Sequence, residues 1–117
     1  MTVSTHVLDA SAGVPAAGVS VTLSLFRQDG GWLDVESGTT GADGRHRFAA
    51  RTPPGTYRLV FATGRYFADR AVATFYPEVT IAFTIPEPAD ALSAGEAAHF
   101  HVPLLLSPFA YSTYRGS

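Results

Sequence analysis

Cysteine and lysine are both missing from this chain of 117 residues, and each absence removes a class of chemistry. Without cysteine there is no thiolate nucleophile, no disulfide and no thiolate ligand for a metal ion. Without lysine no Schiff base can form on the protein, and all eight basic residues other than histidine are arginines. Any catalysis must therefore rely on histidine, carboxylates, hydroxyls, arginine and backbone groups.

Long apolar segments and strong charge are also missing. No run approaches the roughly twenty apolar residues that span a membrane, and the net charge of −2 offers no basic field for nucleic acid. The first residues, Met-Thr-Val-Ser-Thr-His, contain neither the basic start nor the apolar stretch of a signal peptide. We therefore expect one soluble, cytoplasmic domain over residues 1–117, with no nucleic-acid or membrane partner.

Apolar and polar residues alternate with period two over most of the chain. In residues 19–25, for example, Val or Leu occupies every odd-numbered position. Such alternation is typical of strands with one face on a core. With the regularly spaced turn signals, it predicts a mostly β protein, an antiparallel sandwich of about eight strands. The expected strands cover residues 2–9, 19–27, 32–38, 45–50, 56–63, 78–86, 98–106 and 110–115.

Two segments interrupt this alternation. Residues 64–75 predict a short helix or an irregular crossover between strands. Residues 86–97, rich in Pro, Ala and Glu, predict the one long flexible loop. The sequence shows no internal repeat and no boundary between domains.

The last residues carry an unusual density of hydrogen-bonding groups. An apolar run, residues 102–106, is followed after Ser107-Pro108 by the segment Ala-Tyr-Ser-Thr-Tyr-Arg-Gly-Ser. Chain ends are usually frayed, so this concentration of hydroxyls and one guanidinium indicates a segment that is held in place and used. By period two, Ser112 and Tyr114 share one face of the last strand. A polar edge strand that limits aggregation is the alternative interpretation.

Histidines supply the candidate groups for proton transfer near neutral pH. His6 lies in the first expected strand, on the same face as Ser4. His101 lies in the strand of residues 98–106, on the face opposite the core row. An inert surface histidine is the alternative interpretation for His6, because most exposed polar residues serve solubility.

The outer face around His101 has two further features. His99 and His101 have a His-x-His spacing that points both imidazoles the same way; this is a known metal-ligand spacing, but one so short that it often occurs without a metal. Pro103 and Leu105 share this face and make it unusually apolar for a surface exposed to water. An apolar outer face of a sandwich usually contacts another subunit, so we expect an oligomer.

Arg45 follows the sequence Gly41-Ala-Asp-Gly44. Asp-Gly is a common pair in tight turns, so a solvated arginine after a hairpin is one interpretation of this segment. The carboxylates are scattered along the chain, and no G-x-S-x-G elbow, P-loop or H-E-x-x-H motif occurs. The residues alone therefore support a soluble β-sandwich with a candidate histidine site.

Four segments, in order along the chain, resemble the motifs of one known family. They are Ser4-Thr-His-Val-Leu-Asp9 with the following Gly13-Val-Pro-Ala and Gly18-Val; Thr40-Gly-Ala-Asp-Gly-Arg45; Phe75-Tyr-Pro-Glu-Val-Thr80; and His101-Val-Pro-Leu-Leu-Leu-Ser-Pro with the closing Tyr-Arg-Gly-Ser117. The family is that of the transthyretin-like 5-hydroxyisourate hydrolases of urate breakdown, and the resemblance covers nearly the whole chain. The departures, at Ala10-Ser11, Gly41 and Ala110, touch no motif residue that would carry chemistry.

The resemblance implies a transthyretin-like (prealbumin-like) sandwich, assembled as a homotetramer with its sites at the subunit interface. It implies hydrolysis of 5-hydroxyisourate to 2-oxo-4-hydroxy-4-carboxy-5-ureidoimidazoline in purine catabolism, without metal or organic cofactor. The implied catalytic residues are His6, Arg45, His101 and Ser117, and the implied substrate-binding residues are His6, Arg45, Tyr114 and Ser112. On this hypothesis the two histidines jointly activate water and transfer protons, and Arg45 binds urate-like carbonyls and developing negative charge.

Three other functions compete with this hypothesis. One is a transthyretin-type carrier that holds a small aromatic ligand without catalysis, although the closing tetrapeptide and the two histidines favour the enzyme. Another is a structural sandwich domain of a surface protein. The third is a metal-dependent hydrolase that uses His6, His99 and His101 as ligands.

Overall fold

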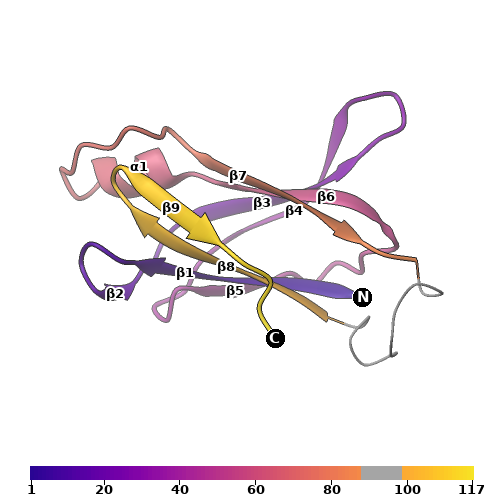
Figure 1. Cartoon of the computed structure of the whole chain (residues 1–117), viewed down its shortest axis with the longest axis horizontal. Helices are drawn as coiled ribbons and strands as arrows, with labels where there is room; N and C mark the ends of the chain where they lie inside the picture. Colours follow the sequence, from indigo (N-terminus) through magenta and orange to yellow (C-terminus); the bar gives the residue numbers. More distant parts are fainter. Residues whose placement is uncertain (88–98) are drawn as a thin grey trace.

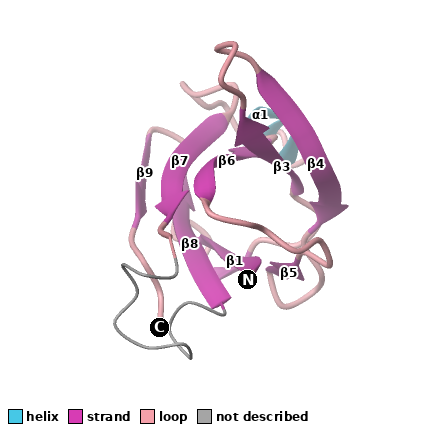
Figure 2. Cartoon of the chain, turned by 90° about the vertical axis from the view of Figure 1, so that its right-hand side faces the viewer, coloured by secondary structure: helices cyan, strands magenta, loops and turns pink. Residues whose placement is uncertain are grey.

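Two β-sheets pack face to face in the computed structural model, which describes residues 1–87 and 99–117 (Figures 1 and 2). The first sheet contains β1 (Thr2–Asp9), β2 (Val14–Pro15), β5 (Arg45–Arg47), β8 (His99–Ser107) and β9 (Ala110–Thr113). The second sheet has the strand order β4-β3-β6-β7 and contains β3 (Ser20–Phe26), β4 (Trp32–Thr39), β6 (Gly55–Phe61) and β7 (Val79–Ile85). A short helix, α1 (Thr63–Ala68), lies between β6 and β7 in the chain.

The predicted mostly β sandwich with one short helix is confirmed. The helix falls at the start of the segment in which the alternation stops. The two-residue strand β2 was not predicted, because two residues are too few to show a period. Strand β9 ends at Thr113, two residues before the predicted end. The predicted loop of residues 86–97 lies, from residue 88 onward, outside the described residues. No helix in the described part of the chain is long and apolar enough to cross a membrane.

Among the described strands, the central pair of the first sheet, β1 and β8, is the one departure from antiparallel pairing. These two strands run parallel over their whole common length, with Thr2 opposite His99, Ser4 opposite His101 and His6 opposite Pro103. Strands β2 and β5 share the other edge of β1, at residues 8–9 and 4–6 respectively. Period two identifies which face of a strand is buried but not its partner, so the sequence alone could not show this pairing.

The core lies between the two sheets, where the predicted apolar rows meet. In β1 every second residue is buried, from Val3 to Asp9, and Ser4 and His6 lie on the outer face. In β8 the predicted row from Phe100 to Leu106 is buried, and His99 and His101 lie half-buried on the outer face. The alternation thus directs the histidines and hydroxyls of both strands to one side of the first sheet, away from the core.

One carboxylate is buried inside this apolar core. Asp9, at the end of β1, is 3 % exposed and accepts hydrogen bonds from the backbone N–H and hydroxyl of Ser11, from the N–H of Ala12 and, at 2.8 Å, from the hydroxyl of Tyr66 in α1. Burial alone would raise the pKa of Asp9, but these hydrogen bonds outweigh it and hold the pKa below its ordinary value of 3.8. The ionised side chain therefore ties helix α1 to the first sheet.

We predict that Tyr66→Phe lowers the free energy of unfolding by about 1.5–3 kcal/mol at neutral pH, the usual worth of a hydrogen bond to a charged group. In the wild type, the stability that ionised Asp9 contributes is present above pH 3.8 and is lost as the pH falls through its lower folded pKa. Tyr66→Phe has lost one of the hydrogen bonds that lower this pKa. The difference in free energy of unfolding between the variant and the wild type therefore becomes smaller in acid. Urea denaturation at several pH values measures both effects.

The matched control is Tyr57→Phe, because the buried Tyr57 hydroxyl donates to a neutral acceptor, the carbonyl of Pro53, at 2.6 Å. Its deficit should be smaller, about 0.5–1.5 kcal/mol, and should not change in acid. Equal deficits for the two variants at every pH would contradict the role given to Asp9.

Candidate active site

A polar cleft of about 310 Å³ opens on the outer face of the first sheet. Strands β5, β1 and β8 and the C-terminal segment (residues 114–117) supply its lining. In Figure 1 this segment ends beside these strands. Three of the predicted catalytic residues, Arg45, His101 and Ser117, line this cleft together. The full lining consists of Ser4, Thr5, Arg45, His46, Arg47, His99, His101 and Ser117. Three segments that are far apart in the sequence therefore meet in one place.

The turn before β5 positions Arg45. Gly44 has a φ of +77°, which glycine adopts without strain, and a Cβ there would collide with the carbonyl of Val7. The Gly44 carbonyl accepts a hydrogen bond from the N–H of Val7 at 2.8 Å, and the Asp43 carboxylate accepts one from the N–H of Arg45 at 3.0 Å. The Asp-Gly pair thus docks β5 on β1 with Arg45 directly opposite His6.

A row of hydroxyls and imidazoles forms the floor of the cleft. The Ser4 hydroxyl lies 2.7 Å from Nδ1 of His101 and 2.8 Å from Nε2 of His99. The other nitrogen of His99, Nδ1, lies 2.7 Å from the hydroxyl of Thr2. The parallel register explains these contacts, because it sets Thr2 and Ser4 directly beside the two histidines. Both histidine rings are therefore held in fixed orientations.

Both histidines of β8 are held in the neutral form. Burial lowers the pKa of His101 below its ordinary value of 6.5, and the positive charge of Arg45 lowers this pKa further. His99 and His6 contribute in the same direction to the pKa of His101. Burial, followed by the charge of Arg47, likewise lowers the pKa of His99. At neutral pH the His101 imidazole can therefore accept a proton.

The C-terminal segment continues along β8 beyond the end of β9. Gly116 lies opposite His101 and donates its N–H to the His101 carbonyl at 2.8 Å. An ideal Cβ built on Gly116 would lie 2.5 Å from Cδ2 of His101 and 3.2 Å from Cγ of Pro103. The absence of a side chain at Gly116 thus lets the backbone pass directly over the His101 ring and brings Ser117 to the cleft.

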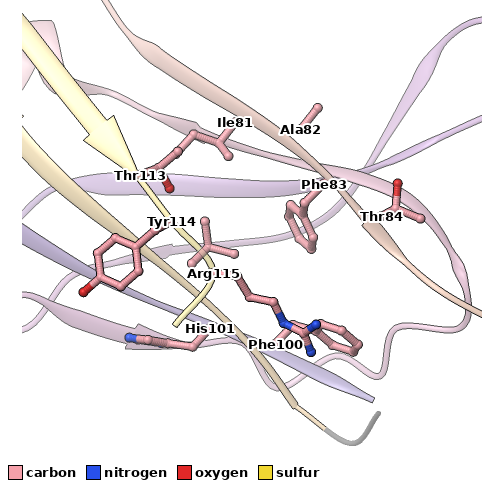
Figure 3. Close-up of a pocket in the computed structure, with 10 residues that line it drawn as sticks. Ile81, Ala82, Phe83, Thr84, Phe100, His101, Thr113, Tyr114 and Arg115 are labelled. Atoms are coloured by element: carbon pink, nitrogen blue, oxygen red, sulfur yellow. The ribbon is translucent and has the colours of Figure 1, made fainter. Parts of the chain in front are cut away.

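Tyr114 and Arg115 point to opposite sides of this segment. In Figure 3 the side chains of Tyr114 and His101 extend to one side, and Arg115 extends to the other, over Phe100. The guanidinium carbon of Arg115 lies 4.9 Å from the centre of the Phe100 ring. Arg115 therefore makes a cation–π contact near the core rather than a contact within the polar cleft. Both residues line a second pocket of about 250 Å³ beside β7.

The remaining predicted residues lie farther from the cleft. His6 is half-buried beside Arg45 but is not among the residues that line the cleft in this single chain. Ser112 is exposed opposite Leu105 and lines neither of the two pockets. The roles of His6, Tyr114 and Ser112 therefore stay predictions.

Ser4 and Arg47 were missed as candidates. The sequence placed Ser4 on the face of His6, but its contact with both histidines of β8 depends on the parallel register. Arg47 follows Arg45 by two residues. Because alternate residues of a strand lie on the same face, this spacing could have shown that the two guanidinium groups share a face.

The third competing function, a metal-dependent hydrolase, requires a group of side chains that can hold a metal ion. No group of three or more His, Asp or Glu side chains within residues 1–87 and 99–117 is arranged to hold a metal ion. Both ring nitrogens of His99 are engaged by hydroxyls, those of Thr2 and Ser4.

Comparisons with known proteins identify similar chains. The model of the HIUase/Transthyretin family matches residues 3–116. A 5-hydroxyisourate hydrolase of Salmonella dublin is 42% identical over 117 residues, which cover 97% of this chain and 79% of that protein. The structure of Klebsiella pneumoniae 5-hydroxyisourate hydrolase is 38% identical, with a TM-score of 0.81 and full coverage of both chains. Transthyretin from Sparus aurata is 30% identical, with a TM-score of 0.85 and coverage of 97% of this chain and 95% of the other.

The close approach of Gly116 to His101 generates a prediction. In Gly116→Ala, either the His101 ring or the C-terminal segment must move, because the new Cβ would overlap Cδ2 of the ring. We expect the NMR signals of the His101 ring to shift, and a loss of stability of only about 0.5–1.5 kcal/mol, the worth of one hydrogen bond. The control is Gly41→Ala, whose Cβ would meet its nearest atom at an ordinary 3.4 Å. Unchanged His101 signals in Gly116→Ala would show that the contact is absent in solution.

Proposed function

Because the chain belongs to the HIUase/Transthyretin family, we propose that the cleft lined by Arg45, His101 and Ser117 is the place where it hydrolyses 5-hydroxyisourate. The observation that carries the proposal is the meeting of these residues, from β5, β8 and the C-terminal segment, in one polar cleft. Its volume of about 310 Å³ suits a small molecule. Relatives at 42% identity over most of the chain are hydrolases of this substrate, so the protein acts in urate degradation.

The chemistry of the lining suits a flat, polar substrate with several carbonyl and N–H groups. Arg45 and Arg47 each present a planar fork of donors, which matches carbonyl oxygens and developing negative charge. The hydroxyl of Ser117 can both donate and accept a hydrogen bond. Tyr114 extends on the same side of the C-terminal segment as His101 (Figure 3), and its part in binding substrate stays a prediction.

In the proposed mechanism, neutral His101 takes a proton from the attacking water as its oxygen bonds to the lactam carbonyl carbon. The carbonyl oxygen becomes an oxyanion, which the Arg45 guanidinium stabilises. The ring C–N bond then breaks, and the leaving nitrogen receives a proton. His6, opposite Arg45 in the sheet, supplies that proton. The lowered pKa of His101 supports its part, because a base must be unprotonated at the pH of the reaction.

A carrier function without catalysis is not favoured. Transthyretin from Sparus aurata shares this fold, so the fold alone does not decide between the two functions. The relatives with the name 5-hydroxyisourate hydrolase match this chain at 38–44% identity, against 30% for that transthyretin. The cytoplasmic location expected from the sequence stays a prediction.

The assembly we propose is a homotetramer with a partner subunit at the cleft. Two features support it. In the described part of the chain, β7 and β9 each pair on one side only, and free strand edges favour pairing between copies. Phe75 and Phe109, 73% and 67% exposed, lie beside the turn between β8 and β9, where the N–H of Phe75 donates to the Pro108 carbonyl. Exposed aromatic side chains of this size suit burial by another subunit.

The apolar outer face that predicted this oligomer is partly covered by the chain itself. Pro103 is buried, and its carbonyl accepts a hydrogen bond from the Thr113 hydroxyl at 2.7 Å. The apolar surface left for a partner centres on Leu105, which lines a shallow pocket with Leu8, Val14 and Pro15.

We predict that light scattering gives a mass four times the chain mass of 12.4 kDa. Substituting Phe109 with Asp should lower this mass, since a buried charge opposes association. A mass of 12.4 kDa for the wild-type protein would contradict the proposed assembly.

The test of the proposed function follows the ultraviolet absorbance of freshly made 5-hydroxyisourate with and without the protein. We expect faster decay with the protein, unchanged by a chelator. His101→Ala and His6→Ala should each lower turnover by roughly a hundredfold or more, the usual worth of a general acid or base. Both side chains lie outside the core, so circular dichroism should show an intact fold. Decay at the buffer rate, or its loss on chelation, would contradict the proposal.

A further inference from the structure

The hydrogen bonds on the cleft floor form one continuous chain, from Thr2 through His99 and Ser4 to His101. We infer that Ser4 and His99 are positioning residues that fix the proton of neutral His101 on Nδ1, so that its Nε2 presents a lone pair to the cleft. This inference rests on the proposed function, in which His101 is the base. Neither residue needs to touch the substrate for this role, because each acts through the His101 ring.

A count of protons restricts the arrangement. The Ser4 hydroxyl has one proton to donate, yet two imidazole nitrogens face it, and a neutral imidazole has one N–H and one bare nitrogen. If both facing nitrogens were bare, one would lack a donor. If both carried protons, the hydroxyl proton would lack an acceptor, since Ser4 Oγ has no further partner within residues 1–87 and 99–117. Every one of these groups finds its partner within the protein only if one facing nitrogen donates to Ser4 and the other accepts from it.

Two arrangements satisfy this condition, and they run in opposite directions. In the first, His101 Nδ1–H donates to Ser4, Ser4 donates to His99 Nε2, and His99 Nδ1–H donates to Thr2. In the second every bond is reversed, and His101 carries its proton on Nε2. The chain therefore couples the protonation of the two rings: the position of the proton on His99 determines its position on His101.

The charges around the rings favour the first arrangement. Arg45 and Arg47 from β5 line the cleft together with His101 and His99, and His6 of β1 lies opposite Arg45. With Nδ1 of His101 engaged by Ser4, Nε2 is the ring nitrogen free to meet the cleft that Arg45 lines. A guanidinium attracts the lone pair of a bare nitrogen and repels an N–H, so the nearby positive charge favours a bare Nε2.

The first arrangement also suits the reaction. A bare Nε2 accepts the proton of the attacking water without any rotation of the ring. The imidazolium that results keeps its Nδ1–H bond to Ser4, so the charged intermediate loses no hydrogen bond. Gly116 lies close to Cδ2 of the His101 ring, so the ring has little room to flip. Its orientation must therefore be set before the reaction.

The direct test is ¹⁵N NMR of the full-length protein labelled in its histidine rings, at about pH 8, where ordinary imidazoles are neutral. For the wild type we expect Nδ1 to be protonated and Nε2 to be bare on both His99 and His101. A His101 ring with its proton on Nε2 would overturn the inference. This measurement needs no substrate, so it decides the arrangement even if the proposed function fails.

Substitution of Ser4 supplies the kinetic test. Ser4→Ala removes the acceptor of the Nδ1–H bond, and we expect a mixture of both forms of neutral His101. We expect kcat to fall roughly tenfold to a hundredfold, as for other partners that orient a functional histidine, with KM nearly unchanged. Ser4→Thr, which keeps the hydroxyl, should restore both kcat and the single NMR form. His99→Gln, which keeps an acceptor, should retain more activity than His99→Ala.

The matched control is Thr22→Ala, which removes a hydroxyl that bonds Ser37 in the second sheet, away from the histidines. It should leave kcat and the His101 spectrum unchanged. A kcat of Ser4→Ala equal to that of Thr22→Ala would overturn the role of Ser4. A wild-type protein that does not hydrolyse 5-hydroxyisourate would instead overturn the proposed function, and the NMR result would still decide the inference.

Discussion

The parallel pairing of β1 with β8 is the constraint on which the site depends. It is a register of backbone hydrogen bonds, and a shift by one residue would turn every side chain of one strand to the other face. In the observed register, Thr2 and Ser4 meet His99 and His101 on the outer face, and Val3 and Val7 enter the core. The same alternation that buries the apolar rows therefore also assembles the polar row.

Much of the fold was predictable because alternation is a local property. The rows of β3, β6 and β8 follow from the sequence, as does the position of α1, where the alternation stops. The turn at Gly44 was predictable as a turn, although the sequence did not show that it docks Arg45 opposite His6. Strand partners, by contrast, depend on contacts between distant residues. For this reason the roles of Ser4 and Arg47 appeared only in the structure.

The position of the C-terminal segment was predicted only in part from the sequence. The density of hydroxyls indicated a segment that is held in place, and the bond from Gly116 to His101 confirms this. Alternation alone placed Tyr114 and Arg115 on opposite faces, as Figure 3 shows. It did not show that Arg115 lies over Phe100, or that Ser112 lies opposite Leu105, outside both pockets. Those positions depend on how far the segment follows β8.

The separation of the two central strands in the sequence has a consequence for folding. The hydrogen bonds of Ser4 and Thr2 to the histidines of β8 join residues 97 and 95 positions apart. Closing so long a loop costs conformational entropy before the contacts compensate for it, and folds rich in such contacts form slowly. The residues of β1 and β8 that face the cleft come together only after β8 has been synthesised and has paired with β1. A partly folded chain would have no imidazole row, so acquisition of the site can serve as a late marker of folding.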